Sequence, residues 1–187
     1  GIIRVVRNRF QHIPIRSAWP ARPMGSGAFR PWLLDRGSLT QRLRARCQVF
    51  AVRGVSQQWA RPQPDEARLL GMRPHHSALL REVSLCCDGQ PVIFAHSVLP
   101  RRSLRGAWHG LGQLGARPLG EALFANPAVV RATLSYRKLS ATSALFRRAA
   151  AGLSEVPPCL WARRSVFLLQ DAPILVTEVF LPGVLKL

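Results

Sequence analysis

The chain has 187 residues, of which 48% are hydrophobic, and this length and composition suit one domain with a single sizeable core. That apolar content excludes disorder over the whole length, and no uninterrupted apolar run approaches the roughly 20 residues of a membrane-spanning helix. The formal net charge is +18, and among the 27 basic residues only Lys138 and Lys186 are lysines. A basic surface attracts nucleic acid, anionic lipid or small acidic metabolites, although the arginine excess can equally reflect genomic base composition.

The N-terminal segment is basic. Six arginines precede the first acidic residue, Asp35. Such a start is typical of a transit peptide, but three prolines interrupt any long amphipathic helix, and no continuous apolar segment supports a secretory signal. We therefore expect residues 1–28 to form a basic, disordered tail and residues 29–187 to form the folded domain.

The first expected elements are short. Apolar spacing predicts a helix over 32–34 and a second one over 38–46, for which Ser38 is a suitable N-cap. A strand over 49–55 and a short helix over 64–70 follow.

A hairpin is the clearest element of the chain. Its strands are expected at 78–87 and 91–99, because Asp88-Gly89 between them is a strong type I′ turn signal.

The second half of the chain is expected to contain helices over 118–124 and 139–153, a strand over 129–137, and a closing hairpin over 160–170 and 174–181. Helices therefore fall between hairpins rather than after every strand. This order indicates a single α+β domain, with an antiparallel sheet and with flanking helices that cover an internal ligand pocket.

Strand periodicity places two charges on otherwise apolar faces. In the strand over 78–87, Arg81 shares its face with apolar residues only, and Glu178 does so in the last strand. A buried charge without a partner is costly. The two side chains therefore either belong to a buried ion pair, with each other or with the backbone, or line a pocket and bind a polar ligand. Arginine suits a carboxylate because its planar fork donates two parallel hydrogen bonds, and a carboxylate suits a hydroxyl.

The other reactive side chains show no metal or catalytic pattern. The cysteines at 47, 86, 87 and 159 form no CxxC, which favours free buried thiols in a reducing compartment. His96 lies on an apolar strand face and is expected to be a core histidine. Signatures of serine hydrolases, zinc proteases, P-loop proteins and dinucleotide-binding proteins are missing from the sequence.

Around Arg81 and Glu178 the sequence resembles the bacterial chorismate lyase family. The matching segments follow the family's order: Trp32-Leu33-Leu34, Gly37-Ser38-Leu39-Thr40, Leu80-Arg81-Glu82-Val83, Pro118-Leu119-Gly120, Leu160-Trp161, Arg163-Arg164-Ser165 and Thr177-Glu178-Val179-Phe180-Leu181-Pro182. Together they are fairly specific, above all the terminal T-E-x-F-L-P after R-R-S. The stretch over 125–159 is longer than the family pattern leads us to expect.

The resemblance implies conversion of chorismate to 4-hydroxybenzoate and pyruvate, the first committed step of ubiquinone biosynthesis. It implies an elimination that makes the ring aromatic without a metal, a cofactor or a covalent nucleophile. It also implies that Arg81 binds the ring carboxylate, that Glu178 lies near the ring hydroxyl, and that Leu39 and Leu119 contribute backbone contacts. An amide at a helix start, as at Leu119, independently suits an anion. We expect a cytoplasmic monomer that binds chorismate and 4-hydroxybenzoate, with no nucleic-acid partner and no membrane insertion.

Two other interpretations remain open. Effector domains of some bacterial transcription regulators are similar in fold to chorismate lyases and sense small carboxylates without chemistry. Those regulators carry a winged-helix domain upstream, for which residues 1–30 are too short and too rich in proline. Charge alone suggests a nucleic-acid-binding protein, and the sequence shows no helix-turn-helix, RRM or KH signature.

Overall fold

The computed structural model describes residues 19–187 and contains a seven-stranded antiparallel sheet. The strand order is β1-β2-β3-β7-β6-β4, and β5 also pairs with β6. The strands are β1 (Phe50–Ala60), β2 (Ala78–Cys87), β3 (Gln90–Pro100), β4 (Val130–Arg131), β5 (Ser135–Leu139), β6 (Leu160–Leu169) and β7 (Ala172–Phe180). The expected α+β fold with one antiparallel sheet is confirmed.

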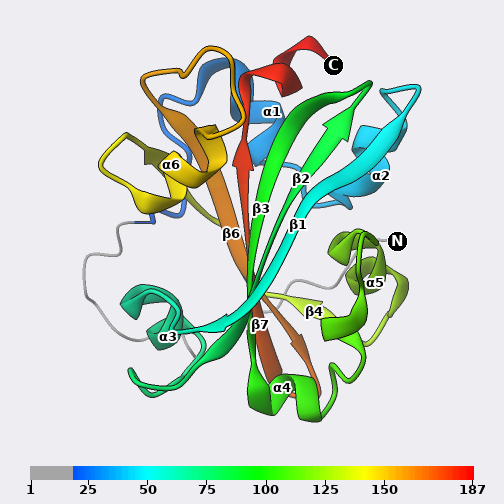
Figure 1. The fold of residues 1–187 in the computed structure, drawn as a ribbon, viewed down its shortest axis with the longest axis vertical. Helices are drawn as coiled ribbons and strands as arrows, with labels where there is room; N and C mark the ends of the chain where they lie inside the picture. Colours follow the sequence, from blue (N-terminus) through cyan, green and yellow to red (C-terminus); the bar gives the residue numbers. More distant parts are fainter. Residues whose placement is uncertain (1–18) are drawn as a thin grey trace.

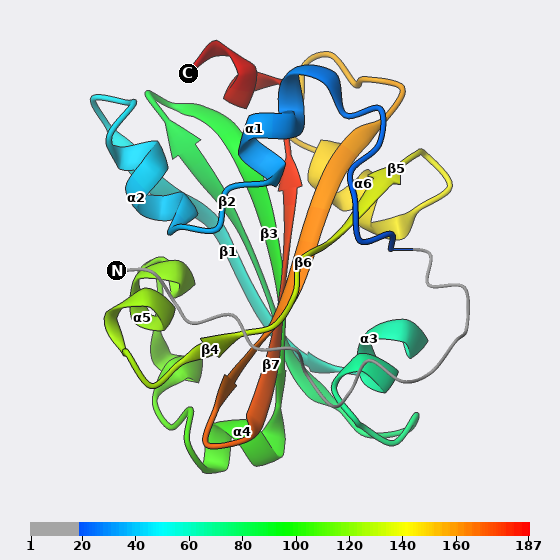
Figure 2. The ribbon, with the colours of Figure 1, turned by 180° about the vertical axis from the view of Figure 1, so that it is seen from behind.

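The helices cover both faces of this twisted sheet (Figures 1 and 2). They are α1 (Arg30–Leu33), α2 (Leu39–Arg44), α3 (Pro64–Leu69), α4 (Arg101–Arg105), α5 (Leu119–Ala125) and α6 (Ala144–Ala150), with 3-10 turns at Gly27–Phe29, Leu111–Gln113 and Pro182–Lys186. Helices α1, α2 and α5 pack on the face that carries Arg81, whereas α3 and α6 pack on the face that carries its neighbour Glu82. Among residues 19–187, no helix is long and apolar enough to cross a membrane.

Local signals account for the elements that the sequence predicts well. The Ser38 hydroxyl accepts a hydrogen bond from the Gln41 amide at 3.3 Å and begins α2, as expected of an N-cap. Asp88 and Gly89 have φ values of 49° and 81°, which is the left-handed backbone that a type I′ turn requires.

Three predicted elements differ substantially from the structure. The strand expected over 49–55 extends to Ala60 in β1. The expected strand over 129–137 is divided into β4 and β5, and the expected helix over 139–153 is shorter. Leu139 is only 2% exposed and pairs with Leu160 of β6 at the end of β5. This strand pairing places Leu139 in the sheet rather than in the helix. Ser143 then caps α6 by accepting from the Phe146 amide at 3.4 Å.

Packing reaches back at least to Trp19, ahead of the expected boundary at residue 29. Trp19 is 6% exposed and belongs to the same apolar cluster as Phe146 and Leu160. The Pro20 carbonyl accepts a hydrogen bond from the Tyr136 amide of β5 at 2.8 Å. The rest of the expected tail, residues 1–18, lies outside the described residues.

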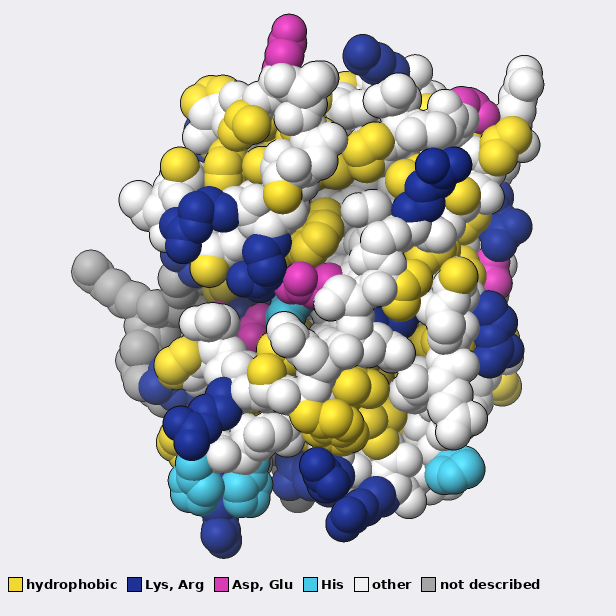
Figure 3. Space-filling view, in the orientation of Figure 1, with side chains coloured by type: hydrophobic (Ala, Val, Ile, Leu, Met, Phe, Trp, Pro, Cys, Tyr) yellow, Lys and Arg dark blue, Asp and Glu magenta, His cyan; other side chains and the backbone are white. Residues whose placement is uncertain are grey.

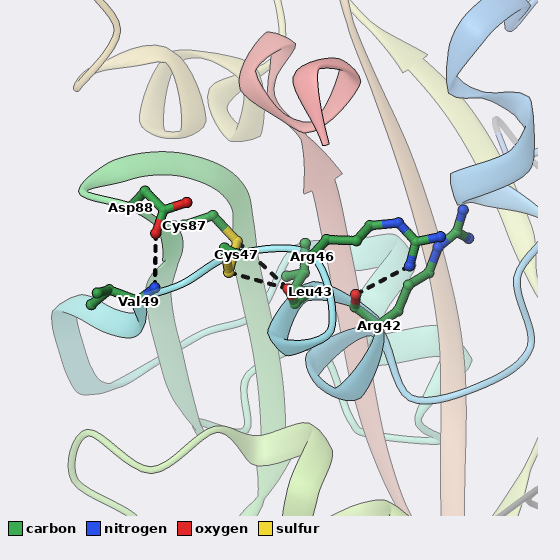
Figure 4. Close-up of a disulfide and its surroundings, with 7 residues drawn as sticks. All are labelled: Arg42, Leu43, Arg46, Cys47, Val49, Cys87 and Asp88. Atoms are coloured by element: carbon green, nitrogen blue, oxygen red, sulfur yellow. Dashed lines mark hydrogen bonds between the residues drawn. A yellow bond between two sulfur atoms is a disulfide. The ribbon is translucent and has the colours of Figure 1, made fainter.

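A disulfide joins Cys47, which follows α2, to Cys87 at the end of β2 (Figure 4). The expectation of free buried thiols is therefore wrong for this pair. It is confirmed for Cys86, whereas Cys159 is free but only half-buried. The two cysteines are 40 residues apart in sequence, and their Cα atoms are 5.4 Å apart. Because the fold brings them together, no local spacing pattern could indicate the bond. It attaches the C-terminal end of α2 to the sheet.

A buried charged cluster joins α3 and α6 to the opposite face of the sheet. His96 Nδ1 lies 2.8 Å from Glu82 Oε1, and His96 Nε2 lies 3.1 Å from Glu66 Oε1 of α3. Arg148 of α6 donates from Nε to Glu82 Oε1 at 2.8 Å. Acidic side chains and a histidine are visible at the bottom of a hollow on this face (Figure 3). His96 is 3% exposed, so it is a core histidine as expected.

The His96 cluster makes stability dependent on pH. Burial alone would lower the pKa of His96, but Glu66 and Glu82 raise it from 6.5 to about 9. A folded-state pKa above the unfolded value gives a stabilisation that is complete below pH 6.5 and is lost as the pH rises through about 9. We expect the free energy of unfolding in urea to fall by a few kcal/mol across this window. In the His96→Gln variant the free energy of unfolding should no longer fall with pH in this window. The His109→Gln variant, changed at an exposed histidine, should keep the wild-type pH dependence. An unchanged pH dependence of stability in His96→Gln would contradict the assignment of this effect to His96.

Candidate active site

A cavity between the sheet and helices α2 and α5 brings together all four residues selected from the sequence. Arg81 comes from β2, Glu178 from β7, Leu39 from the start of α2 and Leu119 from the start of α5. Most of the other lining residues are apolar: Val83, Leu85, Ala95, Leu123, Phe124, Phe167 and Val176. The cavity is thus an apolar space with charged groups at defined points, as in many small-molecule sites.

Arg81 is held by the backbone of the loop that precedes α5. Its side chain is 1% exposed, and Nη2 donates to the carbonyl oxygens of Gly115 and Arg117 at 3.0 Å each. Its Nε is buried and has no hydrogen-bond partner among the described residues. Burial lowers the pKa of Arg81. The backbone therefore fixes the guanidinium at the cavity wall without neutralising its charge.

Glu178 does not pair with Arg81. Its Oε2 accepts a hydrogen bond from Nε of Arg163 on the neighbouring strand β6, at 2.5 Å. Arg163 is completely buried, and its Nη1 donates to the carbonyl oxygens of Trp32, Leu33 and Asp35. Each of the two expected charges thus has its own protein partner, and both also line the same cavity.

The Leu39 and Leu119 amides belong to first helical turns, where N–H groups have no acceptor within the helix. The two helices meet closely beside them. A Cβ atom added at Gly120 would lie 3.0 Å from Thr40 Oγ1, so α5 approaches α2 at a position that suits glycine. This contact brings the two helix starts to one wall of the cavity.

Two further arginines at this site, Arg163 and Arg131, were not selected from the sequence. Arg163 alternates along β6 with Trp161 and Ser165, and it is the only charge on that face. The rule that selected Arg81 could therefore have selected it. Arg131 lies in the two-residue strand β4, which is too short for periodicity to indicate a face.

No three His, Cys, Asp or Glu side chains gather as a possible metal-ligand set within residues 19–187.

Comparisons with known proteins give the family. The chorismate lyase profile matches residues 20–186. A relative from Methylobacillus flagellatus, named probable chorismate pyruvate-lyase, is 47% identical over 92% of this chain and 97% of its own. A relative of the same name from Aromatoleum aromaticum is 50% identical over 90% of this chain and 92% of its own.

Two solved structures show a similar fold. PhnF from Mycobacterium smegmatis matches 80% of this chain and 66% of its own length, with a TM-score of 0.57 and 19% identity. The C-terminal domain of a histidine utilization repressor from Pseudomonas syringae matches 72% of this chain and 93% of its own, with a TM-score of 0.54 and 9% identity. These likenesses concern the fold alone. The profile and the curated relatives together show that the chain belongs to the chorismate lyase family.

Proposed function

We propose that this lyase converts chorismate to 4-hydroxybenzoate and pyruvate without a cofactor, as the first committed step of ubiquinone biosynthesis. The observation that carries the proposal is the single cavity that holds Arg81, Glu178 and the starts of α2 and α5. In this proposal, Arg81 and the amides of Leu39 and Leu119 bind the ring carboxylate. Glu178 accepts a hydrogen bond from the ring hydroxyl.

The chemistry balances within the substrate. The hydrogen on the ring carbon that bears the hydroxyl passes to the methylene carbon of the enolpyruvyl group. The bond between the neighbouring ring carbon and the ether oxygen breaks, that oxygen becomes the keto oxygen of pyruvate, and the ring becomes aromatic. The protein contributes by orienting the substrate in an apolar cavity and by matching its charges.

Orientation depends on groups that are fixed before binding. Arg81 is held by two carbonyl oxygens, and Glu178 by one buried arginine. Two anchors at opposite ends of a rigid ring would fix its direction in the cavity. The side chain that carries the methylene could then fold back over the hydrogen that it receives.

The decisive experiment is incubation of the purified protein with chorismate in the presence of a metal chelator. We expect 4-hydroxybenzoate and pyruvate to appear in equal amounts. No turnover, or turnover that requires an added metal ion, would contradict the proposal.

A sensor of small carboxylates is the alternative, and the fold likeness to the ligand-binding domain of a putative GntR-family regulator from Bordetella bronchiseptica favours it. Binding of chorismate without conversion would identify a sensor.

We also propose that the protein is a cytoplasmic monomer without a nucleic-acid partner. Size-exclusion chromatography would test the monomeric state, and a DNA-binding assay at physiological salt would test the absence of a nucleic-acid partner.

A further inference from the structure

Positive charge exceeds negative charge at the Glu178 end of the cavity. Two buried arginines face this one carboxylate: Arg163 Nε lies 2.5 Å from Glu178 Oε2, and Arg131 Nη2 lies 3.9 Å from the same oxygen. Asp35 is the other carboxylate that interacts electrostatically with both arginines, and it is already paired with Arg42 at 2.8 Å. With Glu178 neutralised by Arg163, the charge of Arg131 has no carboxylate of its own among the described residues.

The surroundings of Arg131 hold it at the cavity wall. Its Nε donates to Ser165 Oγ at 2.8 Å, its Nη1 donates to the Arg36 carbonyl at 3.4 Å, and its Cζ lies 5.1 Å from the centre of the Phe167 ring. The residue is 4% exposed and lines the cavity. At 3.9 Å, Nη2 is beyond hydrogen-bond distance of Glu178.

Arg131 keeps its charge at neutral pH despite this burial. Burial and the neighbouring Arg163 lower its pKa to about 10, which still leaves it protonated. A buried cation of this kind is costly unless an anion meets it. The protein supplies only Glu178, which Arg131 shares with Arg163. A ligand anion is therefore the partner that would compensate the charge of Arg131.

We propose that Arg131 binds the second carboxylate of a dianionic substrate, the carboxylate on its enolpyruvyl side chain. This inference rests on the proposed function. The cavity offers two arginines, Arg81 and Arg131, that donate no hydrogen bond to a carboxylate of the described residues, and chorismate carries two carboxylates. The ring hydroxyl and the enolpyruvyl ether are on adjacent ring carbons, so a ligand with its hydroxyl at Glu178 carries its side-chain carboxylate into the same end of the cavity.

This arrangement gives the two arginines different specificities. The substrate has both carboxylates, whereas 4-hydroxybenzoate retains only the ring carboxylate. Loss of Arg81 should therefore weaken the binding of both ligands, and loss of Arg131 should weaken only the binding of the substrate. A merely structural role for Arg131, joining β4 to the sheet, would affect both ligands alike.

The test compares Arg131→Gln and Arg131→Lys with wild type and with Arg147→Gln, which removes an exposed arginine of α6. We measure kcat/KM for chorismate and the Kd of 4-hydroxybenzoate. Loss of a charged hydrogen-bonding group should lower kcat/KM of Arg131→Gln by about 10- to 100-fold. The Lys variant should recover part of this loss, and Arg147→Gln should behave as wild type. The Kd of 4-hydroxybenzoate should change less than about threefold, because that ligand lacks the second carboxylate. An equal loss for both ligands, or no loss for chorismate, would overturn the proposal.

A stable dianion separates this inference from the proposed function. In wild type, 3-(carboxymethoxy)-4-hydroxybenzoate should bind more tightly than 4-hydroxybenzoate, and Arg131→Gln should abolish the difference. This comparison needs no turnover, so it decides the role of Arg131 even if no pyruvate forms. If Arg131→Gln does not fold, Arg131→Lys must reduce the wild-type preference for the dianion, and an unchanged preference would refute the inference.

Discussion

Replacement of Arg81 by alanine is expected to lower kcat/KM for chorismate by at least about 100-fold, because a bidentate charged contact to a carboxylate contributes roughly 3 kcal/mol. The same change should weaken the binding of 4-hydroxybenzoate to a similar degree, since both ligands carry the ring carboxylate. The carbonyl oxygens of Gly115 and Arg117 would also lose their donor. Steady-state kinetics and a binding isotherm for the product, made on protein shown to be folded by circular dichroism, measure these effects.

Arg81→Lys tests whether charge alone is enough. An ammonium group cannot donate to two loop carbonyls and to a carboxylate with the planar geometry of a guanidinium, so most of the loss should remain. Arg105→Gln, an exposed arginine of α4, controls for the general effect of positive charge on substrate capture and should retain nearly all activity. Near wild-type turnover in a folded Arg81→Ala variant would exclude Arg81 as the carboxylate-binding group.

The sequence predicts those parts of this molecule that depend on local rules. The first hairpin and the Ser38 cap follow from turn and capping chemistry, and the positions of Arg81 and Glu178 follow from alternation along strands. The closing hairpin is also predicted, but its turn lies at Gln170 and Asp171, and Ala172 and Pro173 already belong to β7. The resemblance to a family then indicates that these two charges share one site.

The remainder depends on contacts between distant segments. The partner of Glu178 comes from the neighbouring strand, and the anchor of Arg81 comes from a loop more than thirty residues later in the chain. The Cys47–Cys87 bond and the late start of α6 also result from tertiary packing. Spacing could not decide between an ion pair and a pocket, because each charge has a protein partner and both line the cavity.

Removal of Arg163 is expected to be the most damaging change to stability. The Arg163→Met variant would leave Glu178 beside only the more distant Arg131, and would leave three main-chain carbonyl oxygens without their donor. Loss of one partner from a buried ion pair destabilises a protein by about 3–5 kcal/mol. Urea unfolding should show a loss of this size. Arg163 would act as a positioning residue, so kcat should also fall more than the affinity for 4-hydroxybenzoate.

A double-mutant cycle separates the ion pair from packing. Most of the penalty in Arg163→Met arises from an uncompensated carboxylate, so the further change Glu178→Gln should recover stability relative to Arg163→Met alone. Arg164→Met, one position along β6, removes a bond to Asp65 on the opposite face and should show no coupling with Glu178→Gln. Strictly additive effects of Arg163→Met and Glu178→Gln would show that the pair does not act as a unit. Arg163 would then support the sheet without positioning Glu178.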